Sequence, residues 1–452
     1  MIKNQQTKKI LTIDGGGIRG ILALGMLEQI EQQLRQATHN SELLLSDYFD
    51  YVSGTSMGAI IGALYASGYS GKEIDSIFHK VDFNKIINDD LPRASKAFYE
   101  RDNSEKYAVR LPFNKFKVKL PSALSKGHNT YSLFLKLLLH VNEVEDFSKL
   151  PIPFFCIATN VETGQQVILD KGNLTQSIMA SGALPSLFQP VEINGKVLID
   201  GGVVNNYPID ELRAKGMEVI IGVDVQDSLL NRDALTSAPD VLFQINNFRT
   251  INDMKLKAKK TDVYLKPDII DFNVVSFKDG ELIIKKGEDE AFNKIEELKK
   301  LVNVQSEQKT TNLKPHPVDS IHINQIYIKG NTNYTRAYVL GKLRFKNNEK
   351  ISYSDFTKGF NNLVATNNFK ALEYELKDSK DKSGYNLIAT VEENKINTYL
   401  KLGIHYDDLY KSAAIVNLTK KRLFFNNDVA SIDLVLGDNV RYNFEYLIDK
   451  GF

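Results

Sequence analysis

Residues 54–58, with the sequence Gly-Thr-Ser-Met-Gly, constrain the fold of this chain more than any other segment. They follow an apolar run, 48–53, and precede a run of small residues with a helical pattern. A serine between two glycines at a strand-to-helix junction fits a sharp turn, because the glycines remove side-chain clashes and the hydroxyl stays accessible. We therefore predict a nucleophile elbow in which Ser56 is the nucleophile and Gly54 and Gly58 permit the turn.

A second glycine-rich segment lies between a predicted strand, 9–13, and a helical pattern over 21–34. Residues 14–20 read Asp-Gly-Gly-Gly-Ile-Arg-Gly, which also fits the pattern of dinucleotide-binding loops. An extra glycine, an arginine inside the loop and the lack of an acidic strand end about 20 residues later argue against that interpretation. Amides at a helix N-terminus stabilise negative charge, so we predict an oxyanion hole here. Its predicted residues are Gly15, Gly16, Gly17, Arg19 as a supporting side chain, and Met57, whose amide follows the nucleophile.

A third motif, Asp200-Gly201-Gly202, follows the apolar run 197–199. A serine hydroxyl needs a neighbour that accepts its proton, and burial at a strand end can raise the pKa of a carboxylate enough for that role. None of the histidines after Asp200 suits this role, because they lie in a linker, in a strand pattern and in another region. We predict Asp200 as the base and Gly201 and Gly202 as the turn that follows it.

These three motifs resemble the signatures of the patatin-like phospholipase family, in the family's order and approximate spacing. The segment 180–190 resembles the text that family members carry before the Asp-Gly-Gly turn, and the resemblance covers about residues 8–305. It implies a three-layer α/β fold, a dyad of Ser56 and Asp200, and hydrolysis of acyl esters in lipids. Such chemistry requires neither a metal ion nor an organic cofactor, and the sequence has no loop of the kind that binds calcium.

Composition bounds the remaining possibilities. The 452 residues are 42% apolar, enough for a large core but too many for one ordinary domain. The net charge of +1 gives no sign of a nucleic-acid partner. The single cysteine, Cys156, excludes an internal disulfide and is expected in a buried strand. The chain has no run of about 18 apolar residues, and the first ten residues lack a signal-peptide core.

Strands alternate with helices in the first part of the chain, which predicts an α/β sandwich over 1–305. The predicted strands are 9–13, 48–53, 154–160, 165–170, 196–199 and 219–225. Within this domain, 98–124 carries Lys115, Lys117 and Lys119 in alternation with apolar residues. Two interpretations stay open: an edge ribbon with a solvated basic face, or a lid that meets acyl tails and anionic head groups.

A polar, proline-containing segment, 306–319, is predicted as a linker to a second domain, 320–395. The order of elements in that domain is strand, helix, helix, strand and strand. This order, with the text Ile-Tyr-Ile-Lys-Gly-Asn at 326–331, resembles a POTRA domain, a periplasmic module of outer-membrane assembly proteins. A generic small α+β domain is the alternative. The predicted elements are strands 321–328, 369–377 and 385–392 and helices 335–343 and 354–364.

The last segment, 396–452, holds four extended runs with alternating faces. Leu400, Leu402, Ile404 and Tyr406, for example, share one face of the first run. The pattern resembles the opening strands of an outer-membrane (OMP85-type) β-barrel, apolar toward lipid and polar toward the lumen. Because a membrane barrel needs at least about eight strands, we expect this chain to be part of a longer protein. The alternative is a soluble antiparallel sheet that packs on the preceding domain or pairs with another chain.

The order of the three regions resembles that of bacterial outer-membrane proteins that carry a lipase on a membrane platform. We therefore predict a phospholipase A-type lipid acyl hydrolase at an outer membrane, with its catalytic domain periplasmic or on the surface. Its predicted partners are a lipid ester, the membrane and outer-membrane assembly machinery. Two alternatives stay open: an assembly scaffold in which the patatin fold is a docking module, and a soluble cytoplasmic esterase with an accessory domain.

Overall fold

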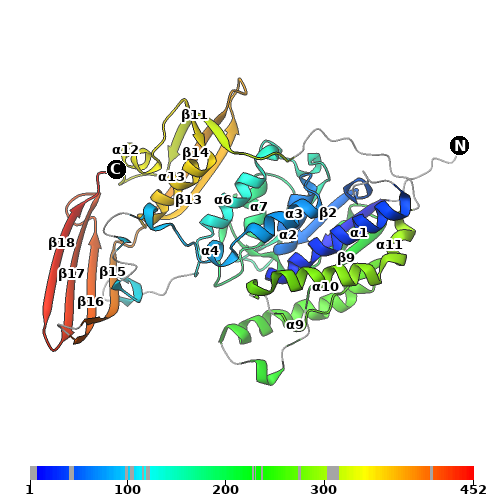
Figure 1. Ribbon diagram of the computed structural model, residues 1–452, viewed down its shortest axis with the longest axis horizontal. Helices are drawn as coiled ribbons and strands as arrows, with labels where there is room; N and C mark the ends of the chain where they lie inside the picture. The colour runs from blue at the N-terminus through cyan, green and yellow to red at the C-terminus, as the bar shows by residue number, and fades with distance from the viewer. Residues whose placement is uncertain are drawn as a thin grey trace. The chain divides into compact units, whose positions relative to one another are not determined.

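The computed structural model divides into two compact units (Figure 1). The first unit is Met1–Asn88 with Asn129–His316, and the second is Asp89–His128 with Pro317–Phe452. Most of the predicted linker, 306–314, and the lysines Lys115 and Lys119 lie outside the described residues. The structure describes residues 8–39, 45–96, 100–101, 106–114, 117–118, 123–226, 229, 231–235, 238–272, 276–302, 315–407 and 411–451.

The first predicted domain, 1–305, is interrupted in the structure, because residues 89–128 belong to the second unit. Strand β3 (Val109–Asn114) pairs antiparallel with β15 (Thr398–Asp407), and β4 (Lys117–Val118) pairs with β3. The edge-ribbon interpretation of this segment therefore agrees with its structure. Local periodicity could not reveal which sheet the ribbon would join, since its partner strand lies almost 300 residues later in the chain.

The first unit is built on an eight-stranded mixed sheet in the order β10-β9-β1-β2-β5-β8-β7, with β6 paired to β5. Five strands run parallel: β10 (Val263–Leu265), β9 (Val219–Val223), β1 (Lys9–Ile13), β2 (Tyr51–Thr55) and β5 (Phe154–Asn160). Three more strands form antiparallel pairs: β6 (Gln166–Leu169) and β8 (Lys196–Asp200) each pair antiparallel with β5, and β7 (Val191–Ile193) pairs antiparallel with β8. All of β1, β2 and β5 are buried, as expected of parallel strands covered on both faces.

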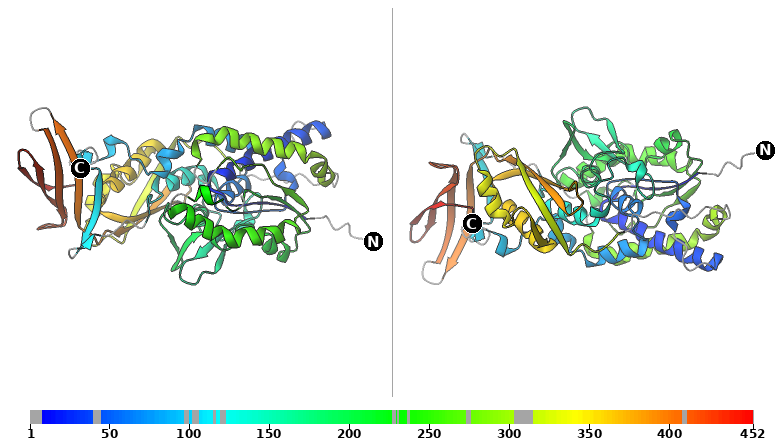
Figure 2. Two further views of the ribbon diagram at one scale, coloured as in Figure 1. Left: turned by 90° about the horizontal axis from the view of Figure 1, so that it is seen from below. Right: turned by 90° about the horizontal axis from the view of Figure 1, so that it is seen from above.

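Two separate apolar cores cover the two faces of this sheet, which confirms the predicted three-layer α/β fold. On one face, Leu11 and Ile13 of β1 pack with α1 (Leu22–Thr38), α2 (Met57–Ala66) and α10 (Gly280–Asn293). On the other face, Ile10 packs with α8 (Ile209–Ala214) and α9 (Ala238–Ala258). Figure 2 shows α9 and α10 on opposite sides of the sheet. Alternation of the β1 side chains between the cores follows from the two-residue period of a strand.

The second unit contains a small α+β domain with a four-stranded sheet in the order β12-β11-β14-β13. Its elements are β11 (Ser320–Lys329), α12 (Arg336–Leu343), β12 (Glu349–Ser352), α13 (Tyr353–Ala365), β13 (Phe369–Asp378) and β14 (Tyr385–Glu393). The predicted helices and strands are present, and β12 is an addition that the sequence did not indicate. With four residues and one buried side chain, β12 is too short to show a period of two.

The four extended runs after residue 396 form strands of the other sheet of the second unit. This sheet is antiparallel and open, with six strands in the order β18-β17-β16-β15-β3-β4. These strands are β15, β16 (Lys411–Lys421), β17 (Asp428–Gly437) and β18 (Arg441–Ile448). The two remaining strands come from the 89–128 segment. Among the described residues, no helix has the length and apolar character needed to cross a bilayer.

This sheet buries its polar face and exposes its apolar face. Leu402, Leu434 and Tyr442 are exposed, and they lie in one cross-strand row with Val416. Ile404, in the next row, is 87% exposed. The opposite face is buried although it is polar, and its buried members include Lys401, Asn417, Thr419, Lys421 and Asp433. The predicted alternation of faces is present, with burial the reverse of that in an ordinary soluble sheet.

The 89–128 segment supplies partners for this polar face. Lys106 and Tyr107 both hydrogen-bond to the Asp433 carboxylate, which also accepts a bond from Asn417. Glu100 lies 3.6 Å from the ammonium of Lys421. Buried charges are tolerated when they are paired and hydrogen-bonded, so these contacts explain how a charged face can be covered.

Candidate active site

Ser56 occupies a sharp turn between β2 and α2. Its backbone has φ 56° and ψ −125°, a conformation that side-chain-bearing residues rarely adopt. A Cβ atom on Gly54 would lie 2.3 Å from the Gly58 carbonyl oxygen, and one on Gly58 would lie 2.2 Å from the Ile13 carbonyl oxygen. Both positions therefore require glycine, as the nucleophile-elbow prediction assumed.

The structure brings Ser56 and Asp200 into direct contact across 144 residues of sequence. The Ser56 Oγ donates a hydrogen bond of 2.6 Å to Asp200 Oδ2. This proximity follows from strand order, because β5 separates β2 from β8. Thr55 pairs with Ile157 of β5, and Asp200 pairs with the next residue, Ala158. The two side chains thus emerge beside the same point of one central strand.

Asp200 is held in place from its other side as well. Its Oδ1 accepts a 2.7 Å hydrogen bond from the Gly202 amide. A Cβ on Gly201 would lie 2.2 Å from the Ile157 carbonyl oxygen, so the turn packs too tightly for a larger residue. Burial raises the pKa of Asp200 to about 6, while the hydrogen bonds from Ser56 and Gly202 oppose this rise. The carboxylate is ionised at neutral pH, yet more basic than an ordinary aspartate.

The glycine-rich loop lies against Ser56. A Cβ on Gly15 would be 2.7 Å from the Ser56 Cβ. Asn206 donates a 2.7 Å hydrogen bond to the Gly15 carbonyl, and Arg19 Nε donates a 3.3 Å bond to the Gly16 carbonyl. Two loop carbonyls are thereby occupied by buried or half-buried side chains. The predicted loop-supporting role of Arg19 agrees with this contact, and Asn206 was not anticipated.

A narrow cavity of about 90 Å³ opens beside Ser56, and Gly17 and Met57 lie in its wall. The other predicted oxyanion residues, Gly15, Gly16 and Arg19, do not line it. The remaining wall is almost entirely apolar, and this feature could not be predicted because its residues come from distant segments. These segments are α3 (Gly71–Lys80), α4 (Phe83–Ile87), α6 (His128–Leu137), α7 (Leu174–Ser181) and the turn that contains Leu187 and Phe188.

A pair of aspartates lies next to the glycine loop. Asp14 follows β1 and Asp224 follows β9, and these strands are parallel neighbours in the sheet. Tyr264 donates a hydrogen bond to Asp224, and Lys266 forms a 3.1 Å ion pair with it. Burial, followed by the charge of Asp224, raises the pKa of Asp14 well above its usual range. We therefore expect Asp14 to be neutral, which lets the two carboxyl groups share this buried place.

Ser181 is a second residue that the sequence did not single out as functional. Its Oγ accepts a 3.0 Å hydrogen bond from the Ser56 amide and donates one of 2.6 Å to the Ile157 carbonyl. The hydroxyl thus links the elbow to β5. Ser181 lies in the 180–190 segment, for which the only sequence signal was its resemblance to family members.

No group of three or more His, Cys, Asp or Glu side chains in the described part of the chain could hold a metal ion. Cys156 is fully buried within β5, as predicted. Three histidine rings have hydrogen-bond partners other than Ser56: His79 with Asp75, His128 with Asn361 and His140 with Ser67.

Residues 11–213 match the family model of patatin-like phospholipases, and residues 385–452 match that of the OMP85 superfamily. The chain therefore carries a patatin-like phospholipase domain with an OMP85-type segment at its C-terminal end. The first match is to the family that the three sequence motifs resemble.

The chain is similar to lysophospholipase NTE1 of two yeasts. It is 27% identical to the Candida glabrata protein over 305 residues, which are 62% of this chain and 15% of the relative. For the Saccharomyces cerevisiae protein the identity is 28% over 306 residues, or 62% and 16%. The chain thus spans about a sixth of these relatives. Among solved structures, VipD from Legionella pneumophila aligns with a TM-score of 0.37 and 15% identity, over 64% of this chain and 67% of VipD.

The Ser181 linkage predicts a loss of stability when its hydroxyl is removed. Ser181→Ala leaves the Ser56 amide without its buried acceptor, so we expect the free energy of unfolding to fall by about 1–3 kcal/mol. Ser177→Ala in the same helix removes a hydroxyl that bonds only the Asn173 carbonyl, and should cost less. Denaturant unfolding of the full chain measures both changes. Equal losses for the two variants would contradict the special role of Ser181.

Proposed function

We propose that this chain is a phospholipase A-type lipid acyl hydrolase that uses a dyad of Ser56 and Asp200 and is tethered at a bacterial outer membrane. The observation that carries the catalytic proposal is the 2.6 Å hydrogen bond from Ser56 Oγ to a buried carboxylate. The apolar cavity beside Ser56 supports an acyl chain as the group that binds there.

In the proposed acylation step, Ser56 Oγ attacks the ester carbonyl carbon as its proton passes to Asp200 Oδ2. The carbonyl oxygen becomes an oxyanion, and in this proposal the amides of Gly17 and Met57, two residues that line the cavity, donate hydrogen bonds to it. Asp200 then returns the proton to the leaving alkoxide as the bond between carbon and the alcohol oxygen breaks. The products of this step are an acyl-serine and an alcohol.

Deacylation reuses the same groups. A water molecule transfers a proton to Asp200 while its oxygen attacks the acyl carbon, and Ser56 Oγ leaves with that proton. The Gly15–Gly17 loop is held by Arg19 and Asn206, so its amides need little reorganisation during either step. The released product is a free fatty acid.

The tethering proposal rests on the C-terminal unit. Residues 385–452 match the OMP85 superfamily, and β15 to β18 within this range belong to the sheet that exposes an apolar face. In this proposal that face contacts lipid, and the domain over 320–395 acts as a POTRA-like module next to outer-membrane assembly machinery. The catalytic domain would then lie on the periplasmic side or at the surface.

Covalent labelling by a fluorophosphonate tests the dyad. In the wild type, Ser56 Oγ should bond to phosphorus with loss of fluoride, because Asp200 removes the hydroxyl proton. Ser56→Ala should abolish labelling, and Asp200→Asn should slow both labelling and ester hydrolysis by at least about a hundredfold. Ser148→Ala, at an exposed serine, is the matched control. A folded wild-type protein that stays unlabelled would favour the scaffold alternative.

The raised pKa of Asp200 predicts the pH dependence of hydrolysis. The base works only when ionised, so kcat/KM should rise with pH, with an apparent pKa of about 6, and level off above pH 7. At pH 5 only about a tenth of the carboxylate is ionised, and the rate should be about tenfold below the plateau. A soluble short-chain ester serves as substrate. A profile that is flat between pH 5 and 7 would exclude Asp200 as the base.

The apolar face predicts a strand-specific effect on membrane binding. Phe444→Glu places a charge on the exposed apolar face of β18 and should reduce flotation of the full chain with phosphatidylethanolamine–phosphatidylglycerol vesicles by at least about threefold. Asn443→Glu adds the same charge to the opposite face of the same strand and should have a smaller effect. An equal loss with both variants would show that general charge, rather than this face, controls binding.

A further inference from the structure

The second unit contains a cavity of about 240 Å³ that the proposed hydrolysis does not use. The 89–128 segment contributes Lys96, Glu100, Tyr107 and Arg110 to its wall, and Asn367 and Lys401 come from the loop after α13 and from β15. The wall is thus assembled from three segments that are far apart in the sequence, and its described charged residues are three cations and one carboxylate.

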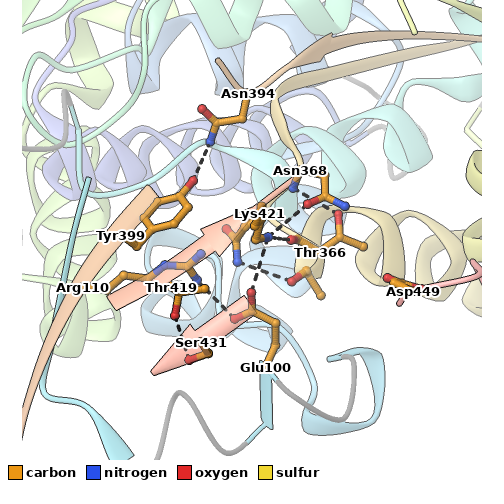
Figure 3. A network of polar contacts seen from close by, with 12 residues as sticks. Glu100, Arg110, Thr366, Asn368, Asn394, Tyr399, Thr419, Lys421, Ser431 and Asp449 are labelled. Atoms are coloured by element: carbon orange, nitrogen blue, oxygen red, sulfur yellow. Dashed lines mark hydrogen bonds and ion pairs between the residues drawn. The ribbon is translucent and has the colours of Figure 1, made fainter. Parts of the chain in front are cut away.

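The carboxylate in the wall, Glu100, is already engaged by cations. Its Oε2 accepts a 3.2 Å hydrogen bond from Arg110 Nη1, and its Oε1 lies 3.6 Å from Lys421 Nζ (Figure 3). Lys421 is fixed by further bonds to the Thr366 carbonyl and to Asn368 Oδ1. Glu100 therefore contacts two cations, Arg110 and Lys421, while Lys96 and Lys401 also line the cavity.

Arg110 presents a donor that the described residues do not satisfy. Its guanidinium lies over the Tyr399 ring, 4.2 Å from the ring centroid, and Nη1 is bonded to Glu100. The second terminal nitrogen, Nη2, is buried and has no hydrogen-bond partner among the described residues. Buried donors are nearly always paired in folded proteins, so this unpaired nitrogen leaves the Arg110 guanidinium, which lines the cavity, with unused hydrogen-bonding capacity.

The surrounding cations also raise one another's electrostatic energy. Burial, followed by repulsion from Arg110, lowers the pKa of Lys401 to about 8. Burial lowers the pKa of Lys421 to about 7; Glu100 opposes this shift, and Arg110, Lys401 and Lys126 add to it. An anion in the cavity would relieve this repulsion and would offer the Arg110 guanidinium a charged acceptor.

We propose that this cavity binds a phosphate group, held by the Arg110 guanidinium and neutralised by Lys96 and Lys401. Guanidinium matches phosphate oxygens in geometry, and a doubly charged phosphomonoester balances the surplus of cations over Glu100 in the wall. The phosphate comes from a lipid head group or from a soluble phosphate ester, because both present the same oxygens to Arg110. The site is independent of the serine hydrolase chemistry.

Isothermal titration of the full chain with inorganic phosphate, in chloride buffer of constant ionic strength, tests the proposal. We expect saturable binding that Arg110→Gln weakens at least about tenfold and Lys96→Gln at least about threefold. Lys96→Gln is the safer variant for folding, because Lys96 is only half-buried. Lys370→Gln is the matched control, since Lys370 pairs with Glu392 on an exposed strand of the same unit and does not line the cavity.

Vesicles made from dialkyl-ether lipids, which an esterase cannot cleave, identify the source of the phosphate. Flotation that requires ether phosphatidic acid and is weakened by Arg110→Gln supports a lipid head group. Binding of inorganic phosphate and glycerol 3-phosphate, with no added flotation from phosphatidic acid, supports a soluble ester. Absence of binding to every phosphate probe, or binding that neither Arg110→Gln nor Lys96→Gln changes, overturns the proposal. None of these outcomes depends on Ser56.

Discussion

The hydrogen bond from Ser56 to Asp200 is the contact on which the proposed chemistry of the first unit depends. It forms because β2 and β8 flank β5, so that the turn after one strand and the end of the other meet at a single point of the sheet. Glycines on both sides of Ser56 pack within van der Waals distance of neighbouring backbone. The elbow is thus held by steric fit, and its strained serine is maintained by the surrounding sheet.

Around this bond, the structure supplies groups that set its chemistry. Burial makes Asp200 more basic, while Ser181 ties the Ser56 amide to β5. Asn206 and Arg19 donate hydrogen bonds to the carbonyls of Gly15 and Gly16, so these glycines are held although they carry no side chains. A serine beside one carboxylate is therefore embedded in a network that fixes its orientation, as the proposed dyad requires in the absence of an intervening histidine.

In the second unit, the charged face of the six-stranded sheet is covered. The apolar side chains of this sheet are exposed, and its polar side chains are buried and have partners in the 89–128 segment. That segment follows α4 and precedes α6 in the chain, and both helices line the cavity beside Ser56. One segment of the chain thus follows a cavity-lining helix and supplies residues that pair with buried charges of the six-stranded sheet. The phosphate proposal follows from the described wall of the cavity in the second unit, where three cations stand against the Glu100 carboxylate.

The sequence by itself determined the local features of this protein. Motifs placed the elbow, the glycine loop and the Asp200 turn on the correct elements, because each requires particular residues at fixed positions in a short segment. Alternating apolar residues predicted β15 to β18 and their two faces for the same reason. Tertiary structure alone decided which distant segments meet: Ser181 with Ser56, Asp14 with Asp224, and Arg110 with Glu100 and Lys401. These contacts depend on strand order and on long-range pairing, which leave no periodic trace in the residues between them.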